Sequence, residues 1–450
     1  MRNSFCRVPA TSNSGDLRIA VLADSDTRWK WGALTARRLA PGHRPAGFLL
    51  RGRATPTARQ LGEVGIGTGP AGPAEVTCAE FLAEIGRANG AERYDVIVLA
   101  LVGGAVQAVL HGVRALWPDP AARPVLVTGY VGVVYEKLTD GLLLRHGADL
   151  VLANSPYDAA RFRAVYEGVG AASDSVTETA LPFLEGAPHE PGAAARTVVF
   201  AVQPSVPESR ADRTYLLARA AAHARLHPGR EVLVKLRSLP GEHTTHLEEQ
   251  PYQRLAGRLP GGLPANCRLV YGNMGAVLDG ADLLVTVSST AALEAMHRGV
   301  PTAVLTDLGI REALGNHHFL GSGCLASWDE LDDGLLPKAD PGWLAEQGVT
   351  PAGEPFAAAR TRLAELLARE QLPPVAPYYT RATAPGYLPG ILARHHLAPD
   401  GTPLPGAVRL DSGESRARRW LRSRLREAAR GAYRHGVQRV APVIRRLGQL

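Results

Sequence analysis

The chain alternates between short runs that are apolar throughout and longer stretches in which apolar residues recur every three or four positions. The first pattern is typical of strands buried on both faces of a parallel sheet, and the second of helices that cover such a sheet. In the first half of the chain, the pattern predicts strands at 17–23, 45–50, 95–101, 124–128, 149–153 and 179–183. It predicts helices between them at 29–39, 79–88, 105–116, 136–145 and 157–167.

The alternation stops at residues 184–196, where Pro, Gly and Ala predict a linker. It resumes with strands predicted at 198–202, 231–236, 267–270, 283–287 and 302–305, and with helices at 213–226, 252–259, 274–280, 291–297 and 355–370. Two such blocks predict an α/β protein of two doubly wound, Rossmann-like domains facing a cleft. The expected divisions are a first domain at 1–185, a second domain at 196–370, and a return segment with a basic helical tail at 371–450.

A polar turn in the second block is the strongest candidate for ligand binding. The apolar strand predicted at 283–287 runs into Ser288, Ser289 and Thr290, and a helix is expected to begin directly afterwards. Hydroxyls and unpaired N–H groups at such a place can hold a phosphate. Glu294, one helical turn further on, is placed to accept hydrogen bonds from a ribose. The alternative is a capped helix with a solvated glutamate.

Two cations end another strand of the same block. Lys235 and Arg237 alternate at its carboxyl end, so their side chains point the same way and could neutralise a phosphate leaving group. Glu242 and His243 follow in a loop expected to contact donor sugar hydroxyls. A second histidine, His246, completes a His-x-x-His spacing, but there is no HExxH order and no evident third ligand, so no metal is expected.

The first domain offers candidates for the acceptor side. The strand predicted at 17–23 ends in Asp24, Ser25 and Asp26, and the two carboxylates could deprotonate an acceptor hydroxyl. Ser25 and Lys30 are expected to contact the acceptor. The alternative is a capped helix with surface charges.

A second candidate for the acceptor side is the glycine-containing loop after the strand predicted at 124–128. The loop would let its backbone approach a ligand closely. Tyr130 of this loop is an acceptor-binding candidate, and Glu136 is a further candidate base.

The segment from 281 to 312, with its serine-rich turn, Glu294 and a following Gly299-Val300-Pro301, resembles the nucleotide-binding half of GT-B glycosyltransferases. The similarity is greatest to bacterial capsule-type sialyl- and Kdo-transferases and to an uncharacterised glycosyltransferase group. In the sialyltransferase-like members, a His-Pro pair and a Ser-Ser/Thr pair contact the donor nucleotide. Here His227 precedes its strand instead of following it, so Lys235 and Arg237 are the better phosphate partners.

The resemblance implies a metal-independent glycosyltransferase without a cofactor. It would move a sugar from a nucleotide-sugar donor to a hydroxyl of a glycan or lipid-linked acceptor. The nucleobase would lie near residues 270–273. Two alternatives stay open: a non-hydrolysing sugar-nucleotide epimerase on the same scaffold, and a non-catalytic protein that binds nucleotide sugars or glycans.

Composition and charge indicate the compartment of the protein and the kinds of partner that it binds. The four cysteines lie far apart and form no CxxC pair, which favours a reducing cytoplasm. The longest apolar run has 11 residues, against about 20 for a membrane span. The net charge is +7, but residues 409–450 contain 12 arginines and three acids, so the rest of the chain is close to neutral and nucleic-acid binding is not expected. Apolar residues between the arginines of 416–447 add an alternative, an anionic membrane surface at the inner face of the membrane.

Overall fold

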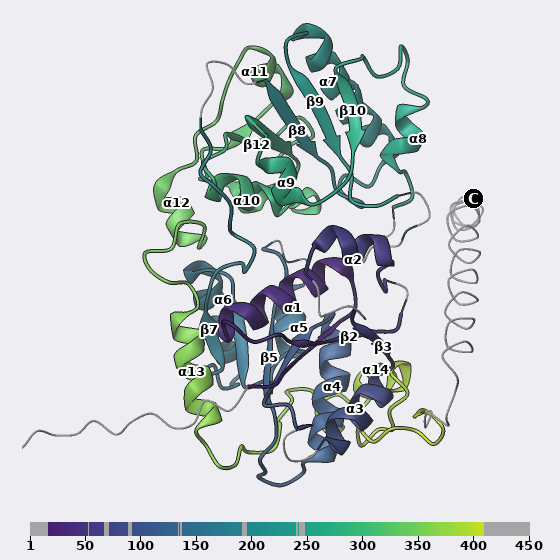
Figure 1. Ribbon diagram of the computed structural model, residues 1–450, viewed down its shortest axis with the longest axis vertical. Helices are drawn as coiled ribbons and strands as arrows, with labels where there is room; N and C mark the ends of the chain where they lie inside the picture. The colour runs from purple at the N-terminus through teal and green to yellow at the C-terminus, as the bar shows by residue number, and fades with distance from the viewer. Residues whose placement is uncertain are drawn as a thin grey trace, which may run out of the picture.

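The computed structural model of the chain describes residues 17–52, 54–66, 72–88, 92–133, 135, 137–190, 196–239, 242 and 248–408. These residues form two α/β units, which lie one above the other in Figure 1, each around its own parallel sheet. The prediction of two doubly wound domains is confirmed. The basic tail at 409–450 lies outside the described residues.

The first sheet has seven strands in the order β3-β2-β1-β4-β5-β6-β7, and all neighbours are parallel. The strands are β1 (Ile19–Ala23), β2 (Ala46–Leu50), β3 (Ala74–Val76), β4 (Val96–Ala100), β5 (Val125–Gly129), β6 (Leu150–Ala153) and β7 (Val176–Glu178). The connecting helices are α1 (Asp26–Leu39), α2 (Ala58–Val64), α3 (Cys78–Arg87), α4 (Gly103–Leu116), α5 (Leu138–Leu143) and α6 (Pro156–Gly168). Every residue of β1 and β4 is buried, as expected of strands covered on both faces.

The second sheet has six parallel strands in the order β10-β9-β8-β11-β12-β13. They are β8 (Thr197–Ala201), β9 (Glu231–Lys235), β10 (Cys267–Val270), β11 (Leu283–Thr286), β12 (Thr302–Leu305) and β13 (Leu325–Ala326). The helices are α7 (Arg210–Leu226), α8 (Tyr252–Ala256), α9 (Met274–Leu278), α10 (Ala291–His297) and α11 (Trp328–Asp332), with 3-10 turns η2 (Glu312–Leu314) and η3 (Asn316–Phe319). In both sheets the strand order reverses beside the first strand, which is where open α/β sheets bind ligands.

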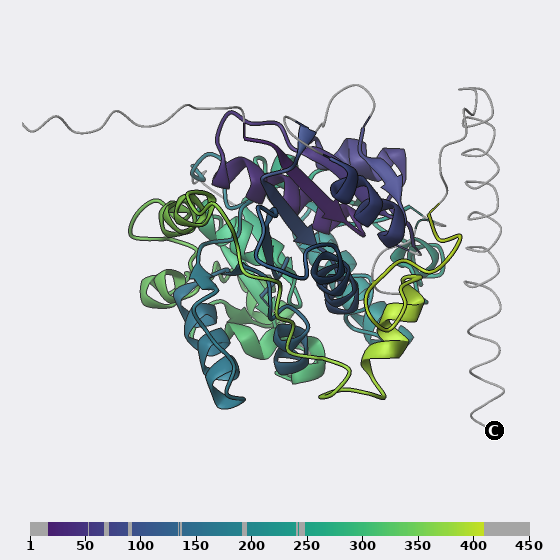
Figure 2. The same ribbon diagram turned by 90° about the horizontal axis from the view of Figure 1, so that it is seen from below.

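The C-terminal helices α12 (Pro341–Glu346), α13 (Ala357–Leu367) and α14 (Leu388–Arg394) return the chain to the first domain. Helix α13 packs on β5, β6 and β7, although it falls within the range expected for the second domain, and α14 packs on α4. Figure 2 shows the green-to-yellow segment between them crossing the lower side of the first domain. Arg123 anchors this segment by donating from Nε to the carbonyl of Pro373 at 2.9 Å, while it pairs with both carboxylate oxygens of Asp149 at 2.8 Å.

Residues 179–183 differ from their sequence prediction. The strand lies earlier, at Val176–Glu178, and the apolar run that follows is not a strand. Leu181 and Phe183 are nevertheless buried, in a cluster that also contains Leu293 of the second domain. The run is apolar because both domains cover it, and periodicity alone does not separate that case from a buried strand.

Candidate functional site

The carboxyl ends of the two sheets face each other, and charged side chains meet between them. Lys235 ends β9 and is only 6% exposed. Its ammonium donates to the carbonyl of Leu236 at 2.7 Å, and within the described residues it has no carboxylate within ion-pair distance. Burial lowers the pKa of Lys235 to about 8. A buried cation without a counter-ion is unfavourable unless a ligand brings one, so Lys235 is a strong candidate for binding an anion.

Arg237 leaves the same strand end and crosses to the first domain. Its Nη2 lies 2.7 Å from Asp26 Oδ1, and it also contacts the hydroxyl of Thr27. Burial raises the pKa of Asp26, but the charge and the hydrogen bond of Arg237 outweigh burial and hold it below its usual value. The structure therefore brings a predicted phosphate-binding cation together with a predicted base.

The second cross-domain pair joins Lys30 of α1 to Glu294 of α10. The Lys30 ammonium lies 3.3 Å from Glu294 Oε2 and 4.8 Å from the centre of the Phe183 ring. Glu294 is 7% exposed, and burial raises its pKa although Lys30 acts in the opposite direction. Lys30, expected on the acceptor side, thus contacts the residue expected to bind the donor's ribose.

The serine-rich turn lies where it was predicted, between β11 and α10, but part of it is internally bonded. The N–H and the hydroxyl of Ser288 contact Gln203 Oε1 at 3.0 and 3.3 Å, and the hydroxyl also contacts the carbonyl of Leu314 at 2.5 Å. The hydroxyl of Ser289 accepts from the N–H of Ala291 at 3.2 Å.

Thr290 is the member of the turn that faces the first domain. It makes no side-chain cap, and a Cβ placed on Gly132 of the first domain would lie 3.4 Å from its hydroxyl. Of the three hydroxyl residues, Thr290 is therefore the one best placed for a ligand between the domains.

Asp24 serves the first domain's own structure. One carboxylate oxygen pairs with Arg28 at 3.0 Å, and the other accepts the N–H of Val102 at the start of α4 at 2.9 Å. Ser25 caps α1 through the N–H of Arg28. These contacts match the capped-helix alternative for Asp24 and Ser25, and they leave Asp26 as the carboxylate of this turn that reaches the second domain.

Helix α2 adds contacts that the sequence analysis did not anticipate. Arg59 pairs with Glu242, whose carboxylate also accepts from Thr57 Oγ1 at 3.0 Å. Glu63 accepts the N–H of Gly272 at 3.1 Å, and its carbonyl accepts from Asn273 Nδ2 at 3.1 Å. Glu242, expected to contact the donor sugar, and the segment expected to hold the nucleobase are thus both occupied by α2. The helix has only seven residues, and the sequence pattern predicted no element at its position.

The loop after β5 is held by residues of the turn that follows β6 and of helix α6. Asn154 donates to the carbonyls of Tyr130 and Gly132 at 2.9 and 3.2 Å, and Tyr135 donates to Asp158 at 2.6 Å. Burial raises the pKa of Asp158 to about 6. The ring of Tyr130 stacks on Arg145 at 4.1 Å, so Tyr130 supports the loop from within. The other loop candidate, Glu136, lies outside the described residues, as does His243 of the second domain.

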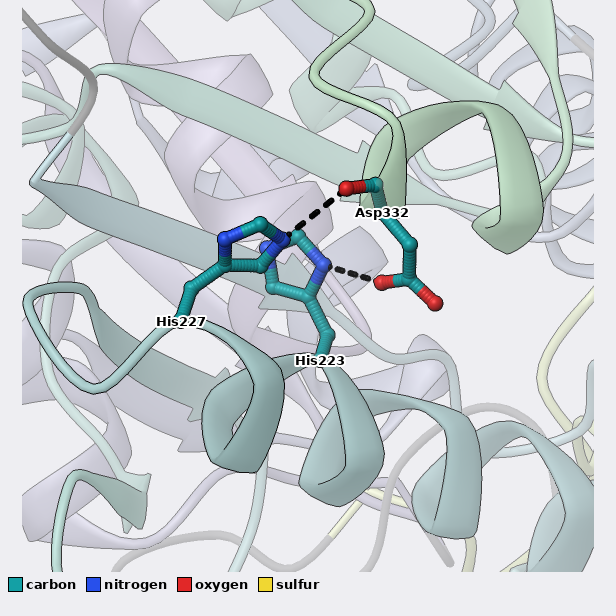
Figure 3. A group of neighbouring side chains, drawn as sticks. All are labelled: His223, His227 and Asp332. Carbon is teal, nitrogen blue, oxygen red and sulfur yellow. Dashed lines mark hydrogen bonds and ion pairs between the residues drawn. The ribbon is translucent and has the colours of Figure 1, made fainter.

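A separate polar cluster lies at the opposite end of β9 (Figure 3). His223 Nδ1 is 2.6 Å from Asp332 Oδ1, and His227 Nε2 is 3.1 Å from the Asp332 carbonyl. Arg230 lies 3.1 Å from His223 Nε2, and Arg219 pairs with Asp332 at 3.0 Å.

This spacing would suit a metal ion, but the hydrogen bonds do not. An arginine can only donate, so His223 Nε2 accepts from Arg230 and its proton is on Nδ1, which leaves Nδ1 no lone pair for a metal. Because β9 separates His227 from Lys235 by roughly 13 Å, His227 cannot share a phosphate with Lys235.

Comparison with known protein families identifies the family of this chain. The model of the family described as "Putative glycosyltransferase (DUF6716)" matches residues 19–366, about three quarters of the chain. The protein therefore belongs to this family, and glycosyl transfer is the activity that its description gives. No curated protein matches the chain.

Solved structures give likenesses of low identity. S. aureus MnaA, in a co-structure with UDP, is 12% identical over 78% of this chain and 95% of its own, with a TM-score of 0.47. The spinosyn rhamnosyltransferase SpnG is 16% identical over 78% and 96%, with a TM-score of 0.40. A Methanocaldococcus jannaschii UDP-GlcNAc 2-epimerase in complex with UDP-GlcNAc and UDP is 10% identical over 78% and 98%, with a TM-score of 0.46. At these values the likenesses say nothing about the substrate of this chain.

A helix that crosses a bilayer needs about 20 predominantly apolar residues. No helix among the described residues combines the length and the hydropathy that a bilayer-spanning segment needs.

Proposed function

We propose that the protein transfers a sugar from a nucleotide-sugar donor to an acceptor hydroxyl, with the donor held by the second domain. The observation that carries this proposal is Lys235, a buried ammonium without a carboxylate partner in the described chain, at the carboxyl end of β9. Arg237 extends from the same strand end. Together the two cations would stabilise the charge that develops on a departing phosphate.

The remaining donor contacts follow from the same sheet edge. Thr290 would bind the phosphate from the neighbouring turn, and Glu294 would accept hydrogen bonds from the ribose. The base of a CMP, UDP or GDP group would lie at the segment from Gly272 to Asn273, whose polar groups Glu63 now engages. A sialyl- or Kdo-transferase-like use of a His-Pro pair would need another residue, because His227 lies at the far end of its strand.

The first domain would supply the base that deprotonates the acceptor. Asp26 is the better of the two aspartates, because Asp24 is bonded through both oxygens to its own domain, whereas the partner of Asp26 is the cation that a donor phosphate would recruit. No metal takes part in this scheme, so turnover should survive EDTA.

The experiment is a panel of CMP-, UDP- and GDP-sugars, scored for transfer, donor hydrolysis and the sugar product in wild type, Lys235→Met and Asp26→Asn. The proposal expects transfer or hydrolysis with one donor class, weaker donor binding in Lys235→Met, and loss of turnover with retained binding in Asp26→Asn. A donor converted to its 2-epimer would identify an epimerase instead. Binding without any turnover would leave a nucleotide-sugar-binding protein.

The location of the acceptor can be proposed from the charge of the C-terminal tail. The 12 arginines and three acids of residues 409–450 would hold the protein on an anionic membrane that carries a lipid-linked acceptor. Full-length protein should sediment with anionic vesicles at low salt and be released at 1 M salt, where the Debye length falls to about 3 Å. Replacing the tail arginines by glutamine should abolish sedimentation; if it does not, the tail is not the membrane contact.

A further inference from the structure

The first domain covers the groups of the second domain that are proposed to hold the donor. Asp26 occupies Arg237 at 2.7 Å, and Lys30 occupies Glu294 at 3.3 Å. Arg59 pairs with Glu242 through two of its nitrogens, one of them at 2.7 Å. These contacts come from α1 and from α2, two successive helices of one domain.

Helix α2 extends the same cover to the nucleobase segment. The carboxylate of Glu63 accepts the N–H of Gly272, and its backbone carbonyl accepts from Asn273. A carbonyl oxygen of a base would use the same donors. Glu63 thus stands where a ligand group of equivalent chemistry would bind.

The charges between the domains balance in this arrangement. The set contains four cations and four carboxylates, namely Lys30, Arg59, Lys235, Arg237, Asp26, Glu63, Glu242 and Glu294. A pyrophosphate adds at least two negative charges, and beside the same carboxylates it would meet like charges. Donor and carboxylates therefore compete for the same cations.

Resting on the proposed function, we propose that these contacts form an interdomain latch, defined by the pairs Asp26–Arg237, Lys30–Glu294 and Arg59–Glu242 and by the Glu63–Gly272 contact, which the donor's phosphates open. When a phosphate recruits Arg237, Asp26 loses the cation that keeps its carboxylate weakly basic. Its pKa then rises, because burial remains while the charge of Arg237 is withdrawn. The latch thereby makes the base competent only after the donor has bound.

Two measurements test the latch. The first is the dissociation constant of CMP, UDP and GDP for wild type and for the double variant Asp26→Asn/Glu63→Gln, by calorimetry. Removing the competing charges should tighten nucleotide binding by about two- to tenfold, the range expected for one or two partly exposed ion pairs. A matched control is Glu231→Gln/Asp329→Asn, which removes two carboxylates from exposed pairs away from the interface and should leave affinity unchanged.

The second measurement is small-angle X-ray scattering of the full chain. Wild type with millimolar pyrophosphate should have a larger radius of gyration than wild type in sodium chloride of equal ionic strength, which is the control for salt screening. Unchanged or weaker nucleotide affinity in the double variant overturns the latch, and so does nucleotide binding without expansion.

The two proposals fail in different ways. Expansion with pyrophosphate while no nucleotide binds would overturn the nucleotide-sugar donor and support an anion-opened latch. Nucleotide binding with transfer, but without expansion, would support the transferase and overturn the latch.

Discussion

The pH dependence of nucleotide binding should report directly on Lys235. Its pKa of about 8 means that roughly 90% of the ammonium is protonated at pH 7 and roughly 10% at pH 9. If only the charged form binds a phosphate, the dissociation constant should rise about tenfold between these values, or about 1.4 kcal/mol. Nucleotide phosphates are already about 90% ionised at pH 7, since their second pKa lies near 6, so their own titration changes little over this interval.

The assay is calorimetric titration of the nucleotide that the panel identifies, at pH 7, 8 and 9. Lys235→Arg keeps its charge throughout and should abolish the tenfold change, because arginine does not deprotonate in this range. Lys235→Met, which carries no charge at any pH, should bind more weakly at pH 7 than wild type does at pH 9 and should lack this pH dependence. If wild type and Lys235→Arg show the same pH dependence, the reasoning about a buried ammonium at the phosphate site is refuted.

Three further predictions concern stability. Burial lowers the pKa of His223 in the folded state, so the stability that the neutral ring contributes is present above the unfolded pKa of 6.5 and is lost as the pH falls. The free energy of unfolding in urea should therefore decrease less between pH 7 and pH 5 in His223→Gln than in wild type. Arg123→Met leaves the largely buried Asp149 carboxylate without its partner and should cost about 3–5 kcal/mol in urea unfolding. Gly129→Ala places a Cβ 2.8 Å from a Trp31 ring carbon and should cost about 1–3 kcal/mol in thermal unfolding.

Matched controls separate these effects from generic damage. Arg268→Met breaks an exposed pair with Glu231 and should change stability by no more than about 1 kcal/mol; a loss equal to that of Arg123→Met would contradict the role of burial. Gly168→Ala, near which a Cβ meets nothing within 4 Å, should be neutral or stabilising. Equal pH dependence in His223→Gln and wild type would assign the acid sensitivity to other groups.

The strands could be predicted because a buried parallel strand has to be apolar on both faces. Val96–Ala100 and Leu283–Thr286 were found on that ground, within a residue or two. Short elements gave no such signal: Ala74–Val76 is largely exposed, and Leu325–Ala326 has only two residues. Lys235 was also predictable, because a cation at the end of an apolar strand must lie at the sheet's carboxyl edge.

The contacts across the interface could not be predicted in the same way. Whether Lys30 meets an acceptor or Glu294 depends on how the two domains are oriented, and no local pattern encodes that orientation. Arg59 and Glu63 occupy a seven-residue polar helix that resembles an ordinary surface helix until the second domain is placed against it. The sequence identifies which residues end the strands, whereas their partners depend on tertiary structure.

The two domains differ at the points where their strand order reverses, and this difference bears on the roles proposed for them. In the first domain, the Asp24 carboxylate after β1 accepts the N–H of Val102 after β4. In the second domain, the neutral amide of Gln203 after β8 accepts the N–H of Ser288 after β11. An anionic ligand at the first point would meet the Asp24 carboxylate, which Arg28 already pairs at 3.0 Å. At the second point it would meet a neutral side chain and, on the strand beside β8, the ammonium of Lys235. Since an ammonium without a carboxylate partner attracts an anion more strongly than an ion-paired carboxylate does, this difference supports the proposal that the donor's phosphates bind to the second domain and that the first supplies the base.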